Sequence, residues 1–130
     1  MKRFLRSIHH VAVICSDYER SKDFYTRILG FEILQEVYRE DRRSYKLDLA
    51  LNGTRVLELF SFPEVPPRVS RPEAAGLRHI AFSVSDLESA LAEFRSLGAL
   101  TEEPRTDEYT GRKFCFLFDP DHLPIELYEE

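Results

Sequence analysis

The feature that most constrains this chain is an eight-residue segment that occurs twice. HVAVICSD begins at His10 and HIAFSVSD begins at His79, and the two share His, Ala, Ser and Asp at the same offsets. The remaining positions are mostly apolar in both copies. Two matching segments in one short chain indicate a duplicated module, so we expect one unit of secondary structure to be built twice.

The residues that follow each copy repeat as well. The segment ends in an Asp, which suits a helix N-cap, and an aromatic residue follows eight positions later in both copies. Further along, a glutamate occurs between apolar residues in two similar segments, VLELF and PIELY. His10 and Glu58 are 48 positions apart, and His79 and Glu126 are 47 apart. Such correspondences in one order favour duplication over coincidence.

Composition restricts the class of protein. Of the 130 residues, 43% are hydrophobic and 32% are charged, a balance typical of a globular domain and not of a disordered or collagen-like chain. The net charge of −5 and the lack of a basic stripe argue against nucleic acid as a partner. No apolar run reaches the roughly 18 residues of a membrane-spanning helix, so we expect no membrane partner either.

The location expected from the sequence is the cytoplasm. The first ten residues, MKRFLRSIHH, are basic but lack the apolar stretch of a secretory signal. The two cysteines, Cys15 and Cys115, each lie in an apolar-rich segment, which is typical of buried thiols in a reducing compartment.

Residues 8–62 are predicted to form a strand, a helix and three further strands. Alternation predicts a strand in IHHVAVICS, and a helix follows that begins after Asp17 and ends at Gly30. Three strand candidates then come in FEILQEVY, SYKLDLAL and TRVLELFSF. Asn52 and Gly53 lie between the last two, which is a strong hairpin signal.

The same order of elements is predicted again after a proline-rich stretch. Residues 61–76 hold four of the seven prolines, so we expect 63–76 to be a linker or a loop over the site. Residues 77–129 then repeat the pattern, with a strand in LRHIAFSVS, a helix from Asp86 to Gly98, and strands around Leu100, in RKFCFLFD and in LPIELYE. The sequence therefore predicts an α+β fold with two βαβββ modules in tandem.

Strand alternation places the repeated histidines and glutamates on one kind of face. Successive side chains of a strand point to opposite faces, so His10 shares a face with small neighbours while the bulky residues pack under the helix. His79 repeats this arrangement. Glu58 and Glu126 also point away from the helices, between apolar strand neighbours, and a carboxylate in that position needs a partner.

Two imidazoles and two carboxylates could hold one divalent cation. This donor set suits nickel, zinc, iron, cobalt or manganese and disfavours sulfur-loving ions. Any one such residue alone is more often structural or solvated, but the repeat ties the four together. We expect His9, which has the opposite parity to His10, and His122, in a predicted turn, to be bystanders.

Three segments resemble the vicinal-oxygen-chelate superfamily, which includes glyoxalase I, bleomycin-resistance proteins and extradiol dioxygenases. They are HVAVICSDYERSKDFYTRILGFEIL, LRHIAFSVSD and FLFDPDHLPIELYE, and the likeness runs from about residue 9 to residue 129. Within the superfamily the chain is similar to small glyoxalase I-like bacterial proteins of the YaeR type. The resemblance implies a single domain over residues 1–130 whose modules, 8–62 and 77–129, form a curled mixed sheet around a metal site.

The resemblance also implies roles for the four selected residues. Glyoxalase I binds its metal through His, Glu, His and Glu, which correspond to His10, Glu58, His79 and Glu126. It implies a homodimer with one divalent ion per site, nickel or zinc before iron, cobalt or manganese. The implied enzyme is a lyase or isomerase that converts a small α-oxo or α-hydroxy substrate through a metal-stabilised enediolate. Glu126 is the expected catalytic base and Glu58 its pseudo-symmetric counterpart.

Two positions depart from glyoxalase I. That enzyme holds glutathione with an arginine four residues after the first histidine and an asparagine four residues after the first glutamate, where this chain has Ile14 and Phe62. Neither side chain can bind a carboxylate or an ammonium group, so glutathione-dependent activity is doubtful. Other arginines could bind an anionic substrate, and those of the proline-rich stretch could close over it. The available arginines are Arg55, Arg68, Arg71, Arg78 and Arg112.

Three other functions known in the superfamily are alternatives. Extradiol ring cleavage on iron uses two histidines and one carboxylate, and thiol transfer to an epoxide antibiotic also uses three protein ligands, so Glu58 argues against both. A non-enzymatic protein that sequesters a drug in the dimer cleft is the third. Such proteins generally lack the metal ligands, which this chain keeps.

Overall fold

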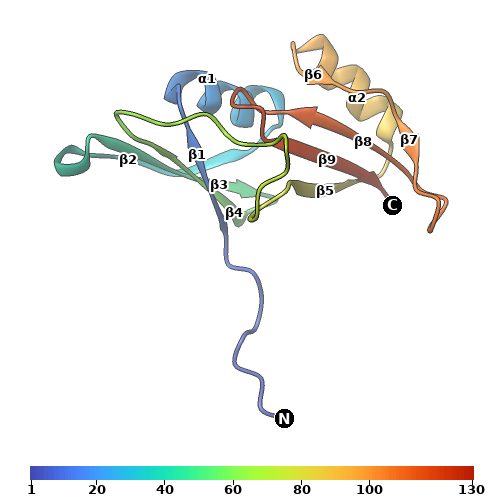
Figure 1. Ribbon diagram of the computed structural model, residues 1–130, viewed down its shortest axis with the longest axis horizontal. Helices are drawn as coiled ribbons and strands as arrows, with labels where there is room; N and C mark the ends of the chain where they lie inside the picture. The colour runs from blue at the N-terminus through green and yellow to red at the C-terminus, as the bar shows by residue number, and fades with distance from the viewer.

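Two mixed sheets, each with a helix packed on it, make up the protein (Figure 1). The computed structural model describes all residues, 1–130. The first sheet has the order β1–β4–β3–β2, and the second has the order β5–β9–β8–β6, with β7 paired to β8. The expected α+β class is confirmed, but the strands form two sheets that do not close into a barrel.

The first sheet contains the first half of the chain. Its strands are β1 (Val11–Cys15), β2 (Glu32–Arg39), β3 (Ser44–Leu51) and β4 (Thr54–Ser61). β1 runs parallel to β4, whereas β2, β3 and β4 are antiparallel neighbours. The Asn52–Gly53 turn joins β3 to β4 with φ of 50° and 79°, the positive values that a two-residue hairpin turn requires. A short 3₁₀ turn, η2 (Glu40–Arg42), joins β2 to β3.

The second sheet repeats this plan. Its strands are β5 (Ile80–Val84), β6 (Leu100–Thr101), β7 (Arg105–Thr106), β8 (Lys113–Phe118) and β9 (Pro124–Glu129). β5 runs parallel to β9, and β8 is antiparallel to β9. The strand predicted around Leu100 is present as β6, whereas β7, whose two residues are both polar, was not predicted. The turn before β9 contains His122 at φ 65°, the left-handed conformation expected there.

Each helix begins at the predicted cap. Asp17 accepts a hydrogen bond from the backbone N–H of Arg20 at 3.2 Å, and Asp86 accepts one from Ser89 at 3.0 Å. The helices are α1 (Tyr18–Asp23), which continues as the π-helical turn η1 (Phe24–Ile28), and α2 (Leu87–Ser96). The predicted first helix is thus partly π-helical, because Leu29 N–H donates to the carbonyl of Phe24, five residues back, at 3.0 Å. Gly30 ends it at φ 83°.

The two halves share one hydrophobic core and a buried hydrogen bond. A continuous cluster of 18 buried apolar residues includes side chains from both sheets and both helices. Phe31 and Phe82 meet edge to face across the halves, with ring centroids 5.6 Å apart. Tyr25 donates to Oδ2 of Asp119 at 2.8 Å, while Oδ1 accepts from two backbone N–H groups. Burial raises the pKa of Asp119, and the hydrogen bonds oppose that shift.

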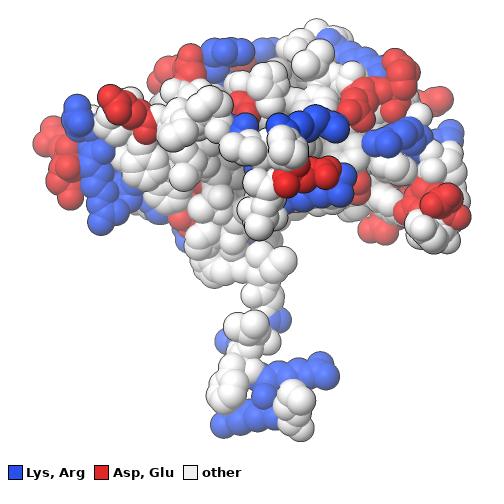
Figure 2. Space-filling view, viewed as in Figure 1, with Lys and Arg blue, Asp and Glu red and all other residues white.

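The first ten residues extend away from the body (Figure 1) and are exposed throughout. On the face in Figure 2, basic side chains gather at the tip of this arm, while acidic and basic side chains alternate over the rest. Cys15 and Cys115 are buried free thiols, as expected. None of the helices has both the length and the apolar character needed to cross a membrane.

Replacing Tyr25 with Phe tests the link between the halves. The change leaves Oδ2 of the buried Asp119 without a partner, so we expect the free energy of unfolding at neutral pH to fall by about 1–3 kcal/mol in urea titrations. Because Asp119 then ionises less readily in the folded state, the loss should shrink as the pH falls through the raised folded-state pKa of Asp119, below which the folded carboxyl is protonated in both proteins. Tyr109→Phe is the control, since Tyr109 is 89% exposed. Equal effects of the two changes would contradict the assigned role of the bond.

Candidate functional site

Parallel pairing of β1 with β4 places His10 beside Glu58. Ala12 lies opposite Glu58 in the register, and His10 is two residues before Ala12 on the same face. The imidazole Nδ1 is 3.4 Å from Oε2 of Glu58, whose side chain is nearly fully buried. His9, expected to be a bystander, contacts this pair: its Nδ1 is 2.8 Å from Nδ1 of His10.

The second half builds the same pair. Ala81 lies opposite Glu126 in the parallel register of β5 with β9, and His79 is two residues before Ala81. Nε2 of His79 is 3.9 Å from Oε2 of Glu126. The ring of Phe116 packs edge-on against the imidazole, with centroids 5.1 Å apart. Nδ1 of His79 is buried and has no hydrogen-bond partner.

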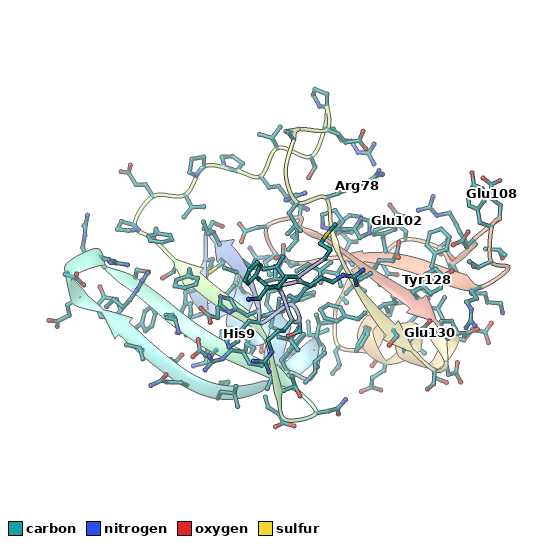
Figure 3. The ribbon with its side chains drawn as sticks, turned by 90° about the horizontal axis from the view of Figure 1, so that it is seen from below. His9, Arg78, Glu102, Glu108, Tyr128 and Glu130 are labelled. Atoms are coloured by element: carbon teal, nitrogen blue, oxygen red, sulfur yellow. The ribbon has the colours of Figure 1, made fainter.

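The two pairs do not meet within one chain. No three His, Cys, Asp or Glu side chains of the chain lie close enough together to hold a metal ion. Figure 3 shows the reason: His9, the neighbour of His10, lies at the first sheet, whereas Tyr128, two residues beyond Glu126, lies on the second. The four predicted ligands are therefore brought together two by two, in the predicted orientation, but not as one cluster in a single copy.

A charged network beside Glu58 was missed by the sequence analysis. Asp48 is 1% exposed and lies directly opposite Glu58 in the pairing of β3 with β4. Lys46 contacts Asp48 at 2.7 Å and Glu58 at 3.7 Å, and Arg55 contacts Asp48 at 3.2 Å. The signal was present in SYKLDLAL, where Lys and Asp alternate with core leucines. These contacts hold two carboxylates and two cations in a network on the face that carries His10.

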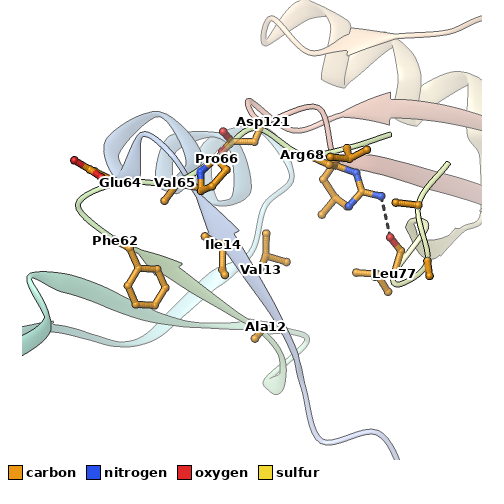
Figure 4. A pocket seen from close by; sticks show the side chains of 14 residues that line it. Ala12, Val13, Ile14, Phe62, Glu64, Val65, Pro66, Arg68, Leu77 and Asp121 are labelled. Carbon is orange, nitrogen blue, oxygen red and sulfur yellow. Dashed lines mark hydrogen bonds between the residues drawn. The ribbon is translucent and has the colours of Figure 1, made fainter. Parts of the chain in front are cut away.

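The proline-rich loop borders an open cavity of about 580 Å³ on the histidine face of β1. Figure 4 shows Ala12 and Ile14 of β1 on one side and Phe62 at the start of the loop on another. Ten of the 14 lining residues are hydrophobic. Ile14 and Phe62, the two departures from glyoxalase I, both line it and supply no charged group there, although Glu64, Arg68 and Asp121 lie elsewhere in the wall.

The arginines of the loop are engaged in other contacts or point to solvent. Arg68 donates to Ser70 at 2.9 Å and to the carbonyls of Leu77 and Arg78 at 2.8 and 3.0 Å (Figure 4), so it braces the loop itself. Arg78 pairs with an exposed glutamate, and Arg71 is exposed. The expectation that Arg68 binds substrate is therefore not supported by its contacts.

A second hollow, of about 1200 Å³, lies between the loop and the second sheet. His79, Phe116 and His122 line it together with Arg71, Arg78 and Arg105. The Glu126 side of the candidate site thus opens into a wide, largely polar space, whereas the first cavity is apolar.

Neither cysteine is placed for nucleophilic chemistry. Burial raises the pKa of the Cys15 thiol to about 11, and its Sγ lies 3.3 Å from the carbonyl of Phe60, to which it donates. Burial also raises the pKa of Cys115. Both remain thiols at neutral pH, and the thiolate is the reactive form.

Comparison with known proteins decides the family. A sequence profile of the Glyoxalase/Bleomycin resistance protein/Dioxygenase superfamily matches residues 7–127. The chain belongs to this superfamily. The chain is also 62% identical to YwkD of Bacillus subtilis (strain 168) and 56% identical to YaeR of Escherichia coli (strain K12), each over 97% of this chain and 98% of the relative. The predicted likeness to the YaeR type is confirmed.

Two further relatives carry glyoxalase names. The glyoxalase family protein from Enterococcus faecalis has the same fold with a TM-score of 0.91 at 46% identity, covering 98% of this chain and all of that one. Lactoylglutathione lyase of Escherichia coli O157:H7 is 31% identical over 93% of this chain and 90% of its own length.

Asp48→Asn tests the network beside Glu58. The change removes the charge that holds Lys46 and Arg55, and it leaves amide hydrogens in a buried place built for an acceptor. We expect the free energy of unfolding to fall by about 1–3 kcal/mol, measured by urea denaturation. Asp41→Asn, at an exposed position in η2, is the matched control and should stay within about 0.5 kcal/mol of the wild type. If the two variants unfold alike, the network does not stabilise the fold.

Proposed function

We propose that the protein is a metal-dependent lyase or isomerase of the glyoxalase type that acts on a small α-oxo or α-hydroxy compound. The observation that carries the proposal is the doubled His–Glu pair, built twice by the same parallel register. In each pair an imidazole and a carboxylate lie within 4 Å of each other on the face away from the helices. A single pair could arise by chance, whereas two built alike indicate a shared task.

The residues present fit a divalent metal. Imidazole nitrogen and carboxylate oxygen are the donors that nickel, zinc, iron, cobalt and manganese accept. Nδ1 of His79 is buried without a hydrogen-bond partner, as expected of an imidazole that binds a metal ion. His10, Glu58, His79 and Glu126 would hold the ion, with nickel or zinc as the first candidates. A closed structural zinc site usually takes cysteine, and both cysteines here lie elsewhere in the core.

A second copy of the chain would complete the site. β1 pairs only with β4, and β5 only with β9, so each histidine lies at a free edge of its sheet. Unpaired edges are places where another chain can add. In a two-fold symmetric homodimer, the His10–Glu58 pair of one copy would face the His79–Glu126 pair of the other, and the symmetry would generate two equal sites.

The contacts of the two glutamates support different roles for them. A bound divalent ion would supply the Lewis acidity that stabilises negative charge on substrate oxygens as a neighbouring C–H bond loses its proton. Glu58 is held by His10 and Lys46 and is 8% exposed, whereas Glu126 contacts His79 alone and is 18% exposed. Glu126 is therefore freer to leave its ligand position, and its carboxylate would take the proton from one carbon and return it to the next.

A drug-sequestering protein is the second candidate function. The apolar cavity of about 580 Å³ favours it, since it has the size and lining of a pocket for a small hydrophobic compound. Extradiol cleavage has less support, because dioxygen and a catechol need three open positions and Glu58 would occupy one of them.

The first prediction concerns where the metal is held. We consider two double variants. One carries His10→Ala and Glu58→Gln, and the other carries His79→Ala and Glu126→Gln. Each should purify with little metal when it is expressed alone. Co-expressed with different tags and isolated as the mixed dimer, they should regain about half the wild-type metal content by elemental analysis, because one of the two sites then has all four ligands. His122→Asn, outside both pairs, should keep full metal content.

The mixed dimer separates the possible outcomes. A site formed within one chain would leave both chains of the mixed dimer defective and metal-free. Wild-type protein that purifies without metal and binds an aromatic drug would support sequestration in place of catalysis.

The second prediction concerns glutathione. With methylglyoxal and glutathione, we expect kcat/KM for the hemithioacetal to stay below about 10⁴ M⁻¹s⁻¹, the lower end for enzymes on their own substrates. The reason is that Ile14 and Phe62 stand at the two positions where glyoxalase I has its glutathione-binding arginine and asparagine, and neither can bind a charged group. A steady-state assay with and without glutathione checks this, and rapid turnover of the hemithioacetal would overturn it.

A further inference from the structure

The open face of the first sheet carries one cation more than its carboxylates neutralise. Lys46 and Arg55 both contact Asp48, and Lys46 also reaches Glu58. Arg39, at the end of β2, pairs with no carboxylate: its only side-chain hydrogen bond goes from Nη2 to the hydroxyl of Ser44 at 2.7 Å. Two carboxylates therefore face three cations, and the charge of Arg39 is left over.

Arg39 is held in place by aromatic rings. Its guanidinium carbon lies 4.9 Å from the ring centroid of Phe60 and 5.9 Å from that of Phe62, distances typical of cation–π contacts. These two rings stack on each other with centroids 6.5 Å apart. Nε of Arg39 is buried without a partner, and Nη1 makes no hydrogen bond in the protein. A guanidinium fixed in position, with its Nη1 N–H groups uncommitted, is suited to bind an anion.

The position of Arg39 relates it to the His10–Glu58 pair. Phe60 is two residues after Glu58 on the same face of β4, a separation of about 7 Å along the strand. Lys46 lies directly opposite Phe60 in the register of β3 with β4. Arg39 therefore lies over the strand that carries Glu58, within reach of a compound of a few bonds that is also bound at the pair.

The second sheet offers no equivalent charge. At the places that correspond to Asp48 and Lys46 it has Phe116, opposite Glu126, and Phe114, opposite Tyr128. Arg105 lies over these rings, but it pairs with Glu102 at 3.5 Å. The uncompensated cation thus belongs to the first half alone, and the second half presents aromatic surface.

We propose that Arg39, held by Phe60, Phe62 and Ser44, is the anion-binding residue of a subsite beside the His10–Glu58 pair. The substrate would then be a small compound that carries a carboxylate or a phosphate group a few bonds from the oxygens bound at that pair. This deepens the proposed function and rests on it for the substrate, but anion binding itself requires no metal. Phe62 stands where glyoxalase I has a glutathione-binding asparagine. In this protein Phe62 instead supports Arg39, which would bind an anion smaller than glutathione.

Nuclear magnetic resonance of the full chain, with arginine Nε–H groups labelled, tests the subsite in metal-free protein. Titration with inorganic phosphate and, separately, with acetate should shift one Nε–H signal saturably. That signal should be absent from the spectrum of Arg39→Lys. It should be present in Arg42→Gln, the control variant, which removes one positive charge at an exposed position of η2. Arg39→Gln should weaken binding of the preferred anion at least tenfold. Saturation by phosphate alone, or by acetate alone, assigns the anionic group of the substrate.

Several outcomes would overturn the subsite. These are no saturation with either anion, shifts spread evenly over many arginines, or unchanged affinity in Arg39→Gln. If Arg39→Gln fails to fold, the titration of the wild-type protein still tests the subsite, because Arg39→Lys identifies which Nε–H signal belongs to Arg39. Metal content tests the proposed function separately, so anion binding without metal would leave the subsite standing and remove the enzyme proposal.

Discussion

The parallel pairing of the first strand of each half with the last strand of the same half is the constraint on which the site depends. It places a residue two positions after each histidine opposite a glutamate, so that the imidazole and the carboxylate become neighbours. The hydrophobic core fixes this register. Leu57 and Leu59 are buried on the other face of β4, and Ile125 and Leu127 are buried on the corresponding face of β9. A slip of one residue would move these side chains off the core face and put the glutamates in their place.

Strand alternation predicts that His10 lies on the face of Glu58 and His79 on the face of Glu126, and one further feature could have been predicted as well. The Asn52–Gly53 turn pairs Leu51 with Thr54, and the same spacing continued along the hairpin would set Leu47, a core residue, opposite Glu58. A bulge at Leu49 and Ala50 shifts the register, so that Asp48 comes opposite Glu58 and the leucines meet each other. The strand register set by the turn differs by one residue from the register that pairs the core leucines with each other. A bulge allows the hairpin to have both.

Other parts of the site depend on contacts that no local pattern encodes. His9 contacts His10 although alternation would place the two side chains on opposite faces. Arg68 is one of the arginines that could close over a substrate, but the carbonyls of its own loop accept hydrogen bonds from its guanidinium. The cation–π support of Arg39 joins the end of β2 to the end of β4, which only the folded sheet brings together. Likewise, the sequence predicts four ligands but not that one chain separates them into two pairs.

X-ray absorption at the metal edge of the purified holoprotein, combined with metal content per chain, tests the central claim most directly. The account predicts about one first-row ion per chain, bound by two imidazole nitrogens with oxygen ligands completing the shell, because each ion must be shared by both His–Glu pairs. A spectrum with a single imidazole per ion, or wild-type protein that takes up no first-row metal, would contradict it.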